Sequence, residues 1–369
     1  MIRIYIDRLP ELRIWYAEQT IPLIRNKHLR PGVQIKADPL SVTFSQHLST
    51  LSEDTIRDIL LTPLEELCKQ YDWIREYVML CDVTAFYPSF REKHPGHRVS
   101  RARAEYIDQY CDCTFFQEAF QETGKTYAIA VKNWGNLDDV IQRAKARRKL
   151  LDSAIAQKFD YSFLPDEIRG TLVEKMGISV CPYCNRQYIQ PVTIDGKKRY
   201  LGDLDHILPK SFYQLFSLSL WNLMPSCKAC NQIFKKNRGA RVLNPQERGF
   251  DKDCLLVLEY HSVREMIGME PPARMQWEIQ PSASSDDRDQ MENNLHIFRL
   301  NEIYDFHRRE IQKTLRRRYL KVSSGYRKSL NRVLPISDDS SLWYGVSLEP
   351  SKFQEEILSK AIYDTIFHN

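Results

Sequence analysis

Four cysteines in two short pairs are the feature that most constrains this chain of 369 residues. Cys181 and Cys184 form the first pair, and Cys227 and Cys230 form the second. Two thiolates separated by two residues can reach one tetrahedral metal ion, so the two pairs predict a closed four-cysteine zinc site. Disulfide bonds are the alternative, and they are disfavoured because nothing in the sequence suggests secretion. The zinc would close a loop over residues 185–226, which contains the other residues that point to a function.

Inside this loop, the pattern favours a strand that ends at Asp205 and His206. Apolar and polar residues alternate in YLGDLDHI (200–207), as expected for a half-buried strand. After an apolar stretch, Ser226 is expected to cap a helix that carries Asn231 and Lys235. Cys227, Asn231 and Lys235 follow each other at intervals of four residues, so they would share one helix face. That face would offer a zinc ligand, a carboxamide oxygen and an ammonium group suited to a phosphate.

The residues of this region together resemble the HNH endonucleases, which are ββα-metal nucleases that cut nucleic acids with one divalent ion. The resemblance rests on LDHILPKS (204–211), LWNLMPSCKACN (220–231) and the lysine that follows. His206 matches the first His of the family, Asn222 matches its Asn, and Asn231 stands where many members have a last His. The cysteine pairs match the zinc-stapled branch. These sequence segments are similar to those of bacterial HNH proteins of anti-phage defence systems, such as the proteins of Septu and certain retrons.

The chemistry of phosphodiester hydrolysis fits these residue types. The reaction needs a water molecule, a base to deprotonate it and a cation to stabilise charge on the leaving oxygen. An imidazole such as that of His206 is a suitable base near neutral pH. Asp205 and Asn231 offer hard oxygen ligands of the kind that Mg²⁺ or Mn²⁺ prefers. The resemblance implies that Asn222 orients His206. A core histidine or a zinc ligand is the alternative for His206, disfavoured because four thiolates already fill the zinc.

Length and composition bound the fold. The chain is longer than one ordinary core, and a hydrophobic content of 43% is typical of globular proteins. The expected fold class is α+β, mostly helical, with a central zinc-stapled ββα-metal (HNH) core. We expect a mainly helical N-terminal region in residues 1–165, the HNH core in 166–250 and a helical C-terminal region in 251–369. The sequence shows neither a membrane-length apolar run nor a signal peptide, so a cytoplasmic protein with reduced cysteines is expected.

Several local expectations follow from shorter patterns. Residues 2–6 alternate as a strand, and Thr62 is expected to cap a helix. Residues 86–98 are expected to form a loop, and residues 255–260 a strand. Asn301 is expected to cap one long helix that carries the densest positive charge in the chain.

This basic helix and Lys235 are the predicted substrate-binding elements. The helix would contact phosphates of the substrate backbone. An acidic partner protein or a solvated face is the alternative for these charges. The predicted phosphate-contacting residues of the helix are Arg308, Arg309, Arg316, Arg317 and Arg318.

The sequence therefore predicts a metal-dependent endonuclease that acts on DNA, in anti-phage defence. A net charge of +5 permits a nucleic-acid partner. Because a constitutive nuclease would be toxic, we also expect a regulatory protein partner, for example an ATPase of a defence system. Two alternatives stay open. One is an RNase, such as a tRNA-cutting enzyme, that uses the same site, and the other is a non-catalytic zinc-stapled nucleic-acid-binding module.

Overall fold

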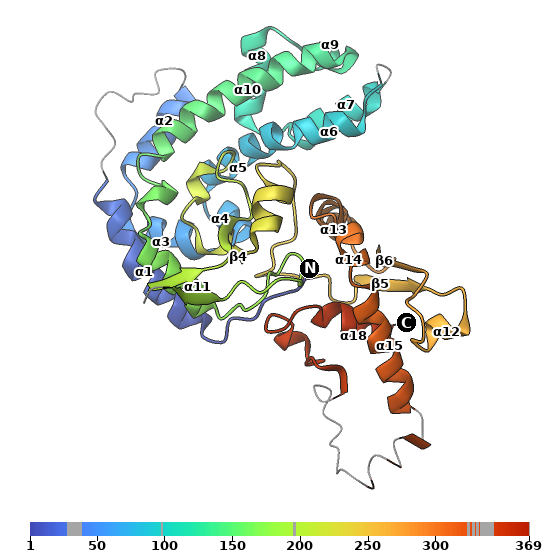
Figure 1. Ribbon diagram of the computed structural model, residues 1–369. Coiled ribbons are helices and arrows are strands. Elements are labelled where there is room, and N and C mark those ends of the chain that lie inside the picture. Colours follow the sequence, from blue (N-terminus) through green and yellow to red (C-terminus); the bar gives the residue numbers. More distant parts are fainter. Residues whose placement is uncertain are drawn as a thin grey trace.

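The computed structural model describes residues 1–27, 39–96, 99–194, 197–322, 325–326, 329, 332 and 343–368. These residues form a mixed α+β structure that is mostly helical, with small two-stranded sheets (Figure 1). The predicted fold class is therefore confirmed at this level. Within the described ranges, no helix is both long and apolar enough to span a bilayer.

Helices of the N-terminal part curve around the segment that follows β3 (Figure 1). The longest of them, α10, packs against α5, α8 and α9. Its buried positions Leu137, Val140, Ala144 and Leu151 recur at helical spacing, which explains why this stretch forms an amphipathic helix. The helices of this part are α1 (Leu9–Arg25), α2 (Pro39–Ser49), α3 (Glu53–Leu61), α4 (Leu64–Gln70), α5 (Asp72–Ala85), α6 (Tyr87–Lys93), α7 (Ser100–Gln109), α8 (Thr114–Thr123), α9 (Tyr127–Lys132), α10 (Trp134–Ile155), η1 (Tyr161–Phe163) and α11 (Asp166–Met176).

Two local predictions for this part are wrong. Thr62 does not cap a helix; it ends α3, and Pro63 takes the N-cap position of α4 without a side-chain hydrogen bond. The expected loop over residues 86–98 contains α6 instead. Pro88 lies in the first turn of α6, where a missing backbone N–H group costs nothing, so the proline that favours a loop is equally compatible with a helix start.

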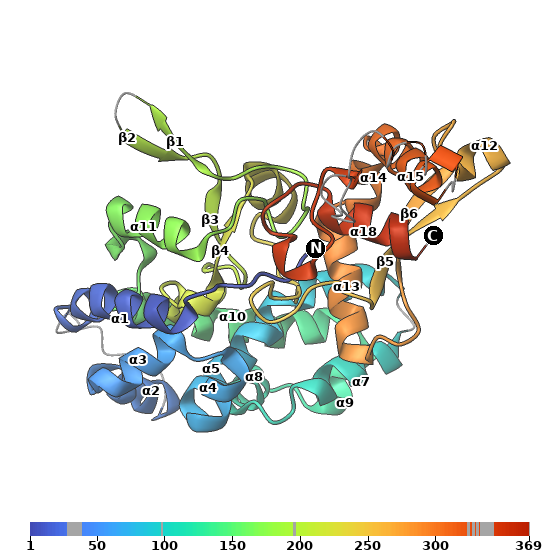
Figure 2. The same ribbon diagram turned by 90° about the horizontal axis from the view of Figure 1, so that it is seen from below.

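The central part contains two antiparallel strand pairs. In the first, β1 (Pro191–Ile194) pairs with β2 (Lys197–Tyr200), and Figure 2 shows this hairpin projecting away from the N-terminal helices. In the second, β3 (Asp203–His206) pairs with β4 (Leu223–Ser226). The strand predicted to end at Asp205 and His206 is thus confirmed. Gly202 precedes β3 at a place where a Cβ atom would lie 2.3 Å from the carbonyl oxygen of Ser226, so a side chain there would force the strands apart.

The helix after β4 differs from the prediction. Ser226 does not cap it, because Ser226 is the last residue of β4. The helix itself, η4 (Ala229–Lys235), is a π-helix. Between the two strands lie the short 3₁₀ helices η2 (Gln214–Phe216) and η3 (Leu220–Asn222).

The C-terminal part combines a small sheet with helices. The antiparallel strands β5 (Cys254–Glu259) and β6 (Arg274–Ile279) confirm the predicted strand near residues 255–260. The prediction of a single long helix from Asn301 is wrong, because the helix is interrupted and two separate helices form. The Asn301 side chain accepts a hydrogen bond from the Trp277 N–H (2.7 Å) and does not cap a helix. Among the residues that the structure describes, the helices of this part are α12 (Val263–Met266), α13 (Ser285–Ile297), α14 (Leu300–Asp305), α15 (Arg308–Val322), η5 (Pro350–Lys352) and α18 (Ser359–Phe367).

One continuous hydrophobic cluster joins the three predicted regions. The first residues of the chain also connect these regions. Residues 2–6 do not form the predicted strand, but the Ile2 N–H donates to the Pro182 carbonyl at 2.9 Å. The Gln354 side chain then binds both backbone groups of Tyr5, at 2.6 Å and 2.7 Å. The segment that carries the first cysteine pair therefore lies between the two ends of the described chain.

Asn185 fixes this junction. It has a left-handed backbone (φ 49°), and its side chain is fully buried. Its amide NH₂ donates to the carbonyls of Phe353 (3.0 Å) and Glu356 (3.1 Å). Its amide oxygen accepts from the Ser359 hydroxyl and the Lys360 N–H, both at 3.1 Å. One side chain thus holds the C-terminal segment against the first cysteine pair.

Replacing Asn185 with Ala is expected to release residues 353–360 from the junction. The change removes four buried hydrogen bonds, and each unpaired buried group costs about 1–3 kcal/mol. Hydrogen–deuterium exchange should accelerate in residues 353–360, and the free energy of unfolding should fall. Asn293→Ala is the control, because the exposed Asn293 amide makes one hydrogen bond, to the Arg241 carbonyl. Unchanged exchange in Asn185→Ala would contradict this role.

Candidate functional site

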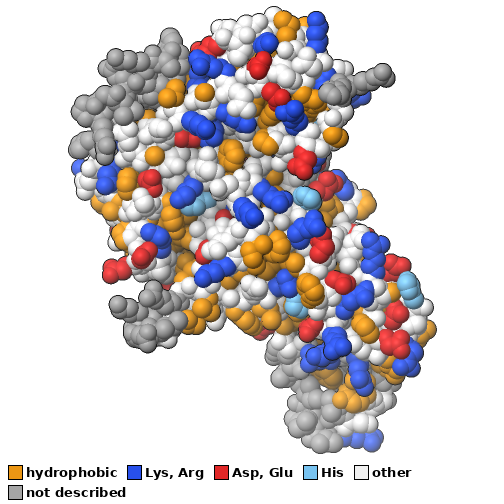
Figure 3. All heavy atoms as spheres, turned by 45° about the horizontal axis from the view of Figure 1, so that its top comes forward, with side chains coloured by type: hydrophobic (Ala, Val, Ile, Leu, Met, Phe, Trp, Pro, Cys, Tyr) orange, Lys and Arg blue, Asp and Glu red, His pale blue; other side chains and the backbone are white. Residues whose placement is uncertain are grey.

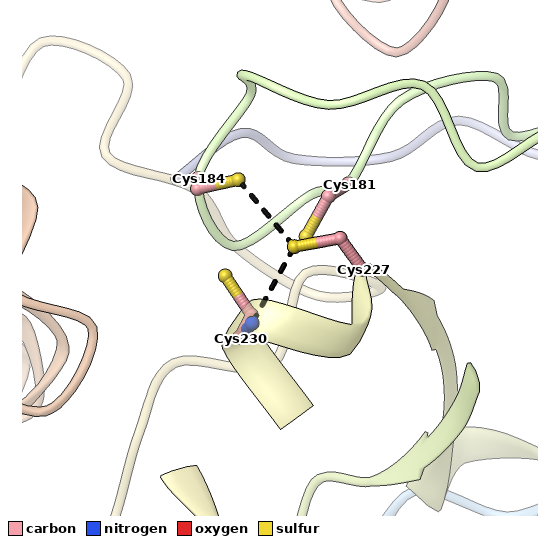
Figure 4. Close-up of side chains that lie close together, drawn as sticks. All are labelled: Cys181, Cys184, Cys227 and Cys230. Carbon is pink, nitrogen blue, oxygen red and sulfur yellow. Dashed lines mark hydrogen bonds between the residues drawn. The ribbon is translucent and has the colours of Figure 1, made fainter. Parts of the chain in front are cut away.

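The four cysteines of the two pairs converge on one point. Cys181 and Cys184 lie before β1, Cys227 directly follows β4, and Cys230 lies in η4. All four are buried, and their sulfur atoms lie within 4.8 Å of one another. Figure 4 shows the four side chains pointing toward each other. Loops that are far apart in sequence are thus brought together by their thiols.

The chemistry of this cluster fits a bound cation. Tetrahedral zinc with sulfur ligands at about 2.3 Å holds them roughly 3.8 Å apart, and the sulfurs of Cys184 and Cys227 are 4.0 Å apart. All nine cysteines of the chain are free, so none of them forms the disulfide bonds that were the alternative to a metal site. Burial raises the pKa of Cys181, whereas hydrogen bonds from the other three thiols lower the pKa of Cys227. The cluster could hold a metal ion such as zinc.

Side chains of η4 form hydrogen bonds with one face of β3. The Lys235 ammonium donates to Asp205 Oδ2 at 2.7 Å and also to the backbone carbonyl of His206. The Tyr183 hydroxyl, from the first cysteine loop, donates to the same Asp205 oxygen at 2.7 Å. Asp205 and Lys235 are both buried. The predicted metal ligand and the predicted phosphate contact are therefore partners of each other.

Asp203 makes the second link between β3 and η4. Its carboxylate accepts hydrogen bonds from the side-chain amides of Asn231 (3.0 Å) and Gln232 (2.9 Å). The sequence interpretation missed Asp203, although side chains two residues apart in a strand lie on the same face and Asp205 had been identified. Asn231 and Lys235 thus face the same strand, as their spacing suggested, even though the helix is of the π type.

His206 lies at the end of β3, and only 9% of it is exposed. Its Nε2 lies 2.8 Å from the backbone carbonyl of Ser217. A carbonyl can only accept, so Nε2 carries the proton in this bond and a neutral ring leaves Nδ1 as a free acceptor. Burial lowers the pKa of His206 from 6.5 to about 4, so the ring is neutral at pH 7. Such an imidazole can take a proton from a molecule placed at Nδ1.

Asn222 closes the loop that supplies the Ser217 carbonyl. Its amide oxygen accepts from the Leu208 N–H at 2.7 Å. Its NH₂ group donates to the carbonyls of Leu208 (3.1 Å) and Phe216 (3.0 Å). Asn222 therefore acts on the backbone around His206, and the orientation of the ring comes from Ser217.

N-terminal helices hold the same loop from outside. The buried Arg148 of α10 donates to the carbonyls of Ser211 (2.9 Å) and Phe212 (3.2 Å). The Tyr213 hydroxyl donates to Asp82 of α5 at 2.6 Å. These contacts join residues more than sixty positions apart, and no local pattern in the sequence could have indicated them.

The predicted substrate-binding arginines of α15 fall into two groups. Arg308 donates to the Ala273 carbonyl, Arg317 to the Tyr344 carbonyl (2.9 Å) and Arg318 to the Thr365 carbonyl (3.1 Å). Arg309 and Arg316 are exposed and have no hydrogen bond or ion pair within the described part of the chain. In both ribbon views, α15 lies on the far side of α18 from β4 (Figures 1 and 2). Their contact with a substrate stays a prediction.

Charged side chains are spread over the surface. Figure 3 shows Lys and Arg side chains interspersed with Asp and Glu side chains on one face. The net charge of +5 is therefore not collected into a single patch on this face.

Comparison of the chain with protein-family models, curated proteins and solved structures yields no match.

Lys235→Met is expected to destabilise the protein by about 3–5 kcal/mol, because it leaves the buried Asp205 carboxylate without its cation. The double variant Asp205→Asn/Lys235→Met should recover much of this loss. Denaturant unfolding at equal metal content measures both. Lys236→Met, at the exposed neighbour, is the control and should change stability by less than about 0.5 kcal/mol. A Lys235→Met protein as stable as the control would show that the pair contributes nothing.

Proposed function

We propose that this protein is a metal-dependent endonuclease that hydrolyses phosphodiester bonds, with DNA as its substrate. The observation that carries the proposal is the hydrogen bond between His206 Nε2 and the Ser217 carbonyl. It leaves a neutral imidazole with one nitrogen available to accept a proton, at the end of the strand whose Asp203 and Asp205 carboxylates contact Asn231 and Lys235.

His206 is the proposed general base. Its Nδ1 takes the proton of the attacking water, while Nε2–H stays bonded to Ser217 and holds the ring in place. The Lys235 ammonium, bonded to the His206 carbonyl and to Asp205, fixes the end of β3 from the other side. The base is thus held at both its ring and its backbone, which lowers the cost of reaching the reactive geometry.

Oxygen ligands for a divalent ion are available where β3 contacts η4. Asp205 and Asn231 are the proposed ligands of Mg²⁺ or Mn²⁺, and the Asp203 carboxylate lies beside Asn231. Such an ion, when bound, would stabilise negative charge on the leaving oxygen. One Asp205 oxygen already binds Lys235 and Tyr183, so this carboxylate is partly neutralised before any ion binds. We therefore expect a weak, exchangeable site.

We further propose that the chain is a zinc-stapled HNH nuclease of bacterial anti-phage defence. Support comes from the order of two antiparallel strands and a helix, β3, β4 and η4, with the cysteine cluster at one end. The proposed regulatory protein partner follows from the same reasoning about toxicity. Because no described residue distinguishes deoxyribose from ribose, matched RNA belongs in every activity assay.

Purified protein is expected to contain one zinc ion per chain, bound by the four cysteines. Cys184→Ser should lose the metal and unfold the region around it, because binding energy at a closed zinc site is folding energy. Elemental analysis and circular dichroism measure the two effects. Cys111→Ser, at an exposed cysteine outside the cluster, should keep both metal and fold. Folded wild-type protein without tightly bound metal would contradict the assignment.

His206→Ala is expected to lower the hydrolysis rate about 10²–10⁴-fold, the usual contribution of a general base. Substrate affinity and zinc content should stay close to those of the wild type, because the base acts in the transition state. The assay uses DNA and RNA of one sequence with added Mg²⁺ or Mn²⁺. His261→Ala, at an exposed histidine, is the control. Wild-type turnover in His206→Ala would exclude this residue as the base.

A further inference from the structure

An aromatic ring from outside the motif region lies against His206. Tyr161 belongs to η1, before α11, and its ring meets the His206 ring edge-on with centroids 4.8 Å apart. In both ribbon views α11 lies beside the β3–β4 pair (Figures 1 and 2). Tyr161 is half-buried, so the residue remains partly open to solvent.

Two cations lie over this same ring. The Arg169 guanidinium carbon is 4.8 Å from the ring centroid, and the Lys210 ammonium is 5.3 Å from it. Arg169 comes from α11, whereas Lys210 comes from the loop that follows β3. Segments distant in sequence thus place two positive charges on one tyrosine, beside His206.

Both cations are available to an anion. Arg169 is positioned by a hydrogen bond from its Nε to the Leu164 carbonyl (2.8 Å). Its ion pair with Asp166 is weak, because 94% of that carboxylate side chain is exposed to water. Lys210 is exposed and has no hydrogen bond or ion pair among the residues that the structure describes. An aromatic ring under a cation orients the charge while leaving its N–H groups free.

We propose that Tyr161, Arg169 and Lys210 form a binding site for a phosphate of the nucleic-acid backbone, next to the phosphate at His206. We name this set the tyrosine clamp. The inference rests on the proposed nuclease function and deepens it, because a nuclease must hold the backbone on both sides of the bond that it cuts. The guanidinium binds phosphate oxygens in a planar, two-bond geometry, and the ammonium adds a point charge.

A neighbouring contact extends the clamp along the same turn. The Lys27 ammonium lies 4.3 Å from the centroid of the Phe163 ring, two residues after Tyr161. Lys27 is exposed, so it adds a further positive charge for a nucleic-acid backbone beside the clamp. The arginines of α15 lie apart from this surface, so the clamp is the better-placed contact for the backbone at the site.

The test measures binding without cleavage. Full-length zinc-loaded protein without added divalent ions is titrated into a fluorescein-labelled single strand of about 12 nucleotides, as DNA and as RNA of one sequence. Arg169→Gln/Lys210→Gln should weaken binding about tenfold or more. The slope of log K against log salt should become shallower by about 0.7 per lost contact. Tyr161→Leu should weaken binding in the same direction, because both cations lose their support.

The control is Arg101→Gln/Lys175→Gln, which removes the same net charge. Arg101 is on α7, and Lys175 lies over the Trp15 ring on another face of α11. This variant should keep the wild-type slope. Equal slopes in the clamp and control variants, or no binding of either oligonucleotide by the wild type at low salt, would overturn the clamp.

Activity assays separate this inference from the proposed function. Binding that depends on the clamp but is never followed by cleavage with Mg²⁺ or Mn²⁺ would remove the nuclease function and leave the clamp in place. Cleavage by the clamp variant with an unchanged KM would support the nuclease function and exclude the clamp. If both hold, KM rises in the clamp variant while kcat changes little.

Discussion

The structure depends on the turn that follows the first cysteine pair. Asn185 closes this turn in a conformation that few residues other than glycine adopt. With its side chain it satisfies backbone groups of the C-terminal segment, while the preceding Pro182 carbonyl binds the start of the chain. The position of the first cysteine pair, the position of both chain ends and the placement of Tyr183 against Asp205 therefore all involve this one turn.

The proposed site is supported from two directions that meet at His206. From the cysteine side, Tyr183 and Lys235 hold the Asp205 carboxylate. From the N-terminal helices, Arg148 holds the loop whose Ser217 carbonyl binds the ring. Arg148 is buried, and its guanidinium binds Asp152 as well as the backbone of this loop. A displacement of α10 would therefore move the backbone of the loop that holds the imidazole.

How much the sequence could predict depends on the range of each interaction. The cysteine pairs and β3 follow from spacing and alternation over a few residues, and both are found. The Lys235–Asp205 pair could not be predicted, because a lysine at this position is as compatible with a phosphate as with a carboxylate, and only the fold decides between them. The predicted helix cap at Asn301 is wrong for a similar reason. Its side chain binds the backbone of Trp277 on β6, and this contact competes with capping. The split between α14 and α15 follows from such tertiary contacts.

The π-helix η4 has a consequence for how this region can change in evolution. π-Turns are rare and are frequently found at functional sites. In this one, Asn231 contacts Asp203 while Lys235 contacts Asp205. Deleting one residue between them would rotate the lysine by about 100° away from the strand. Relatives with a one-residue shorter helix would therefore need a different partner for the buried carboxylate, so helix length and the identity of that partner should vary together.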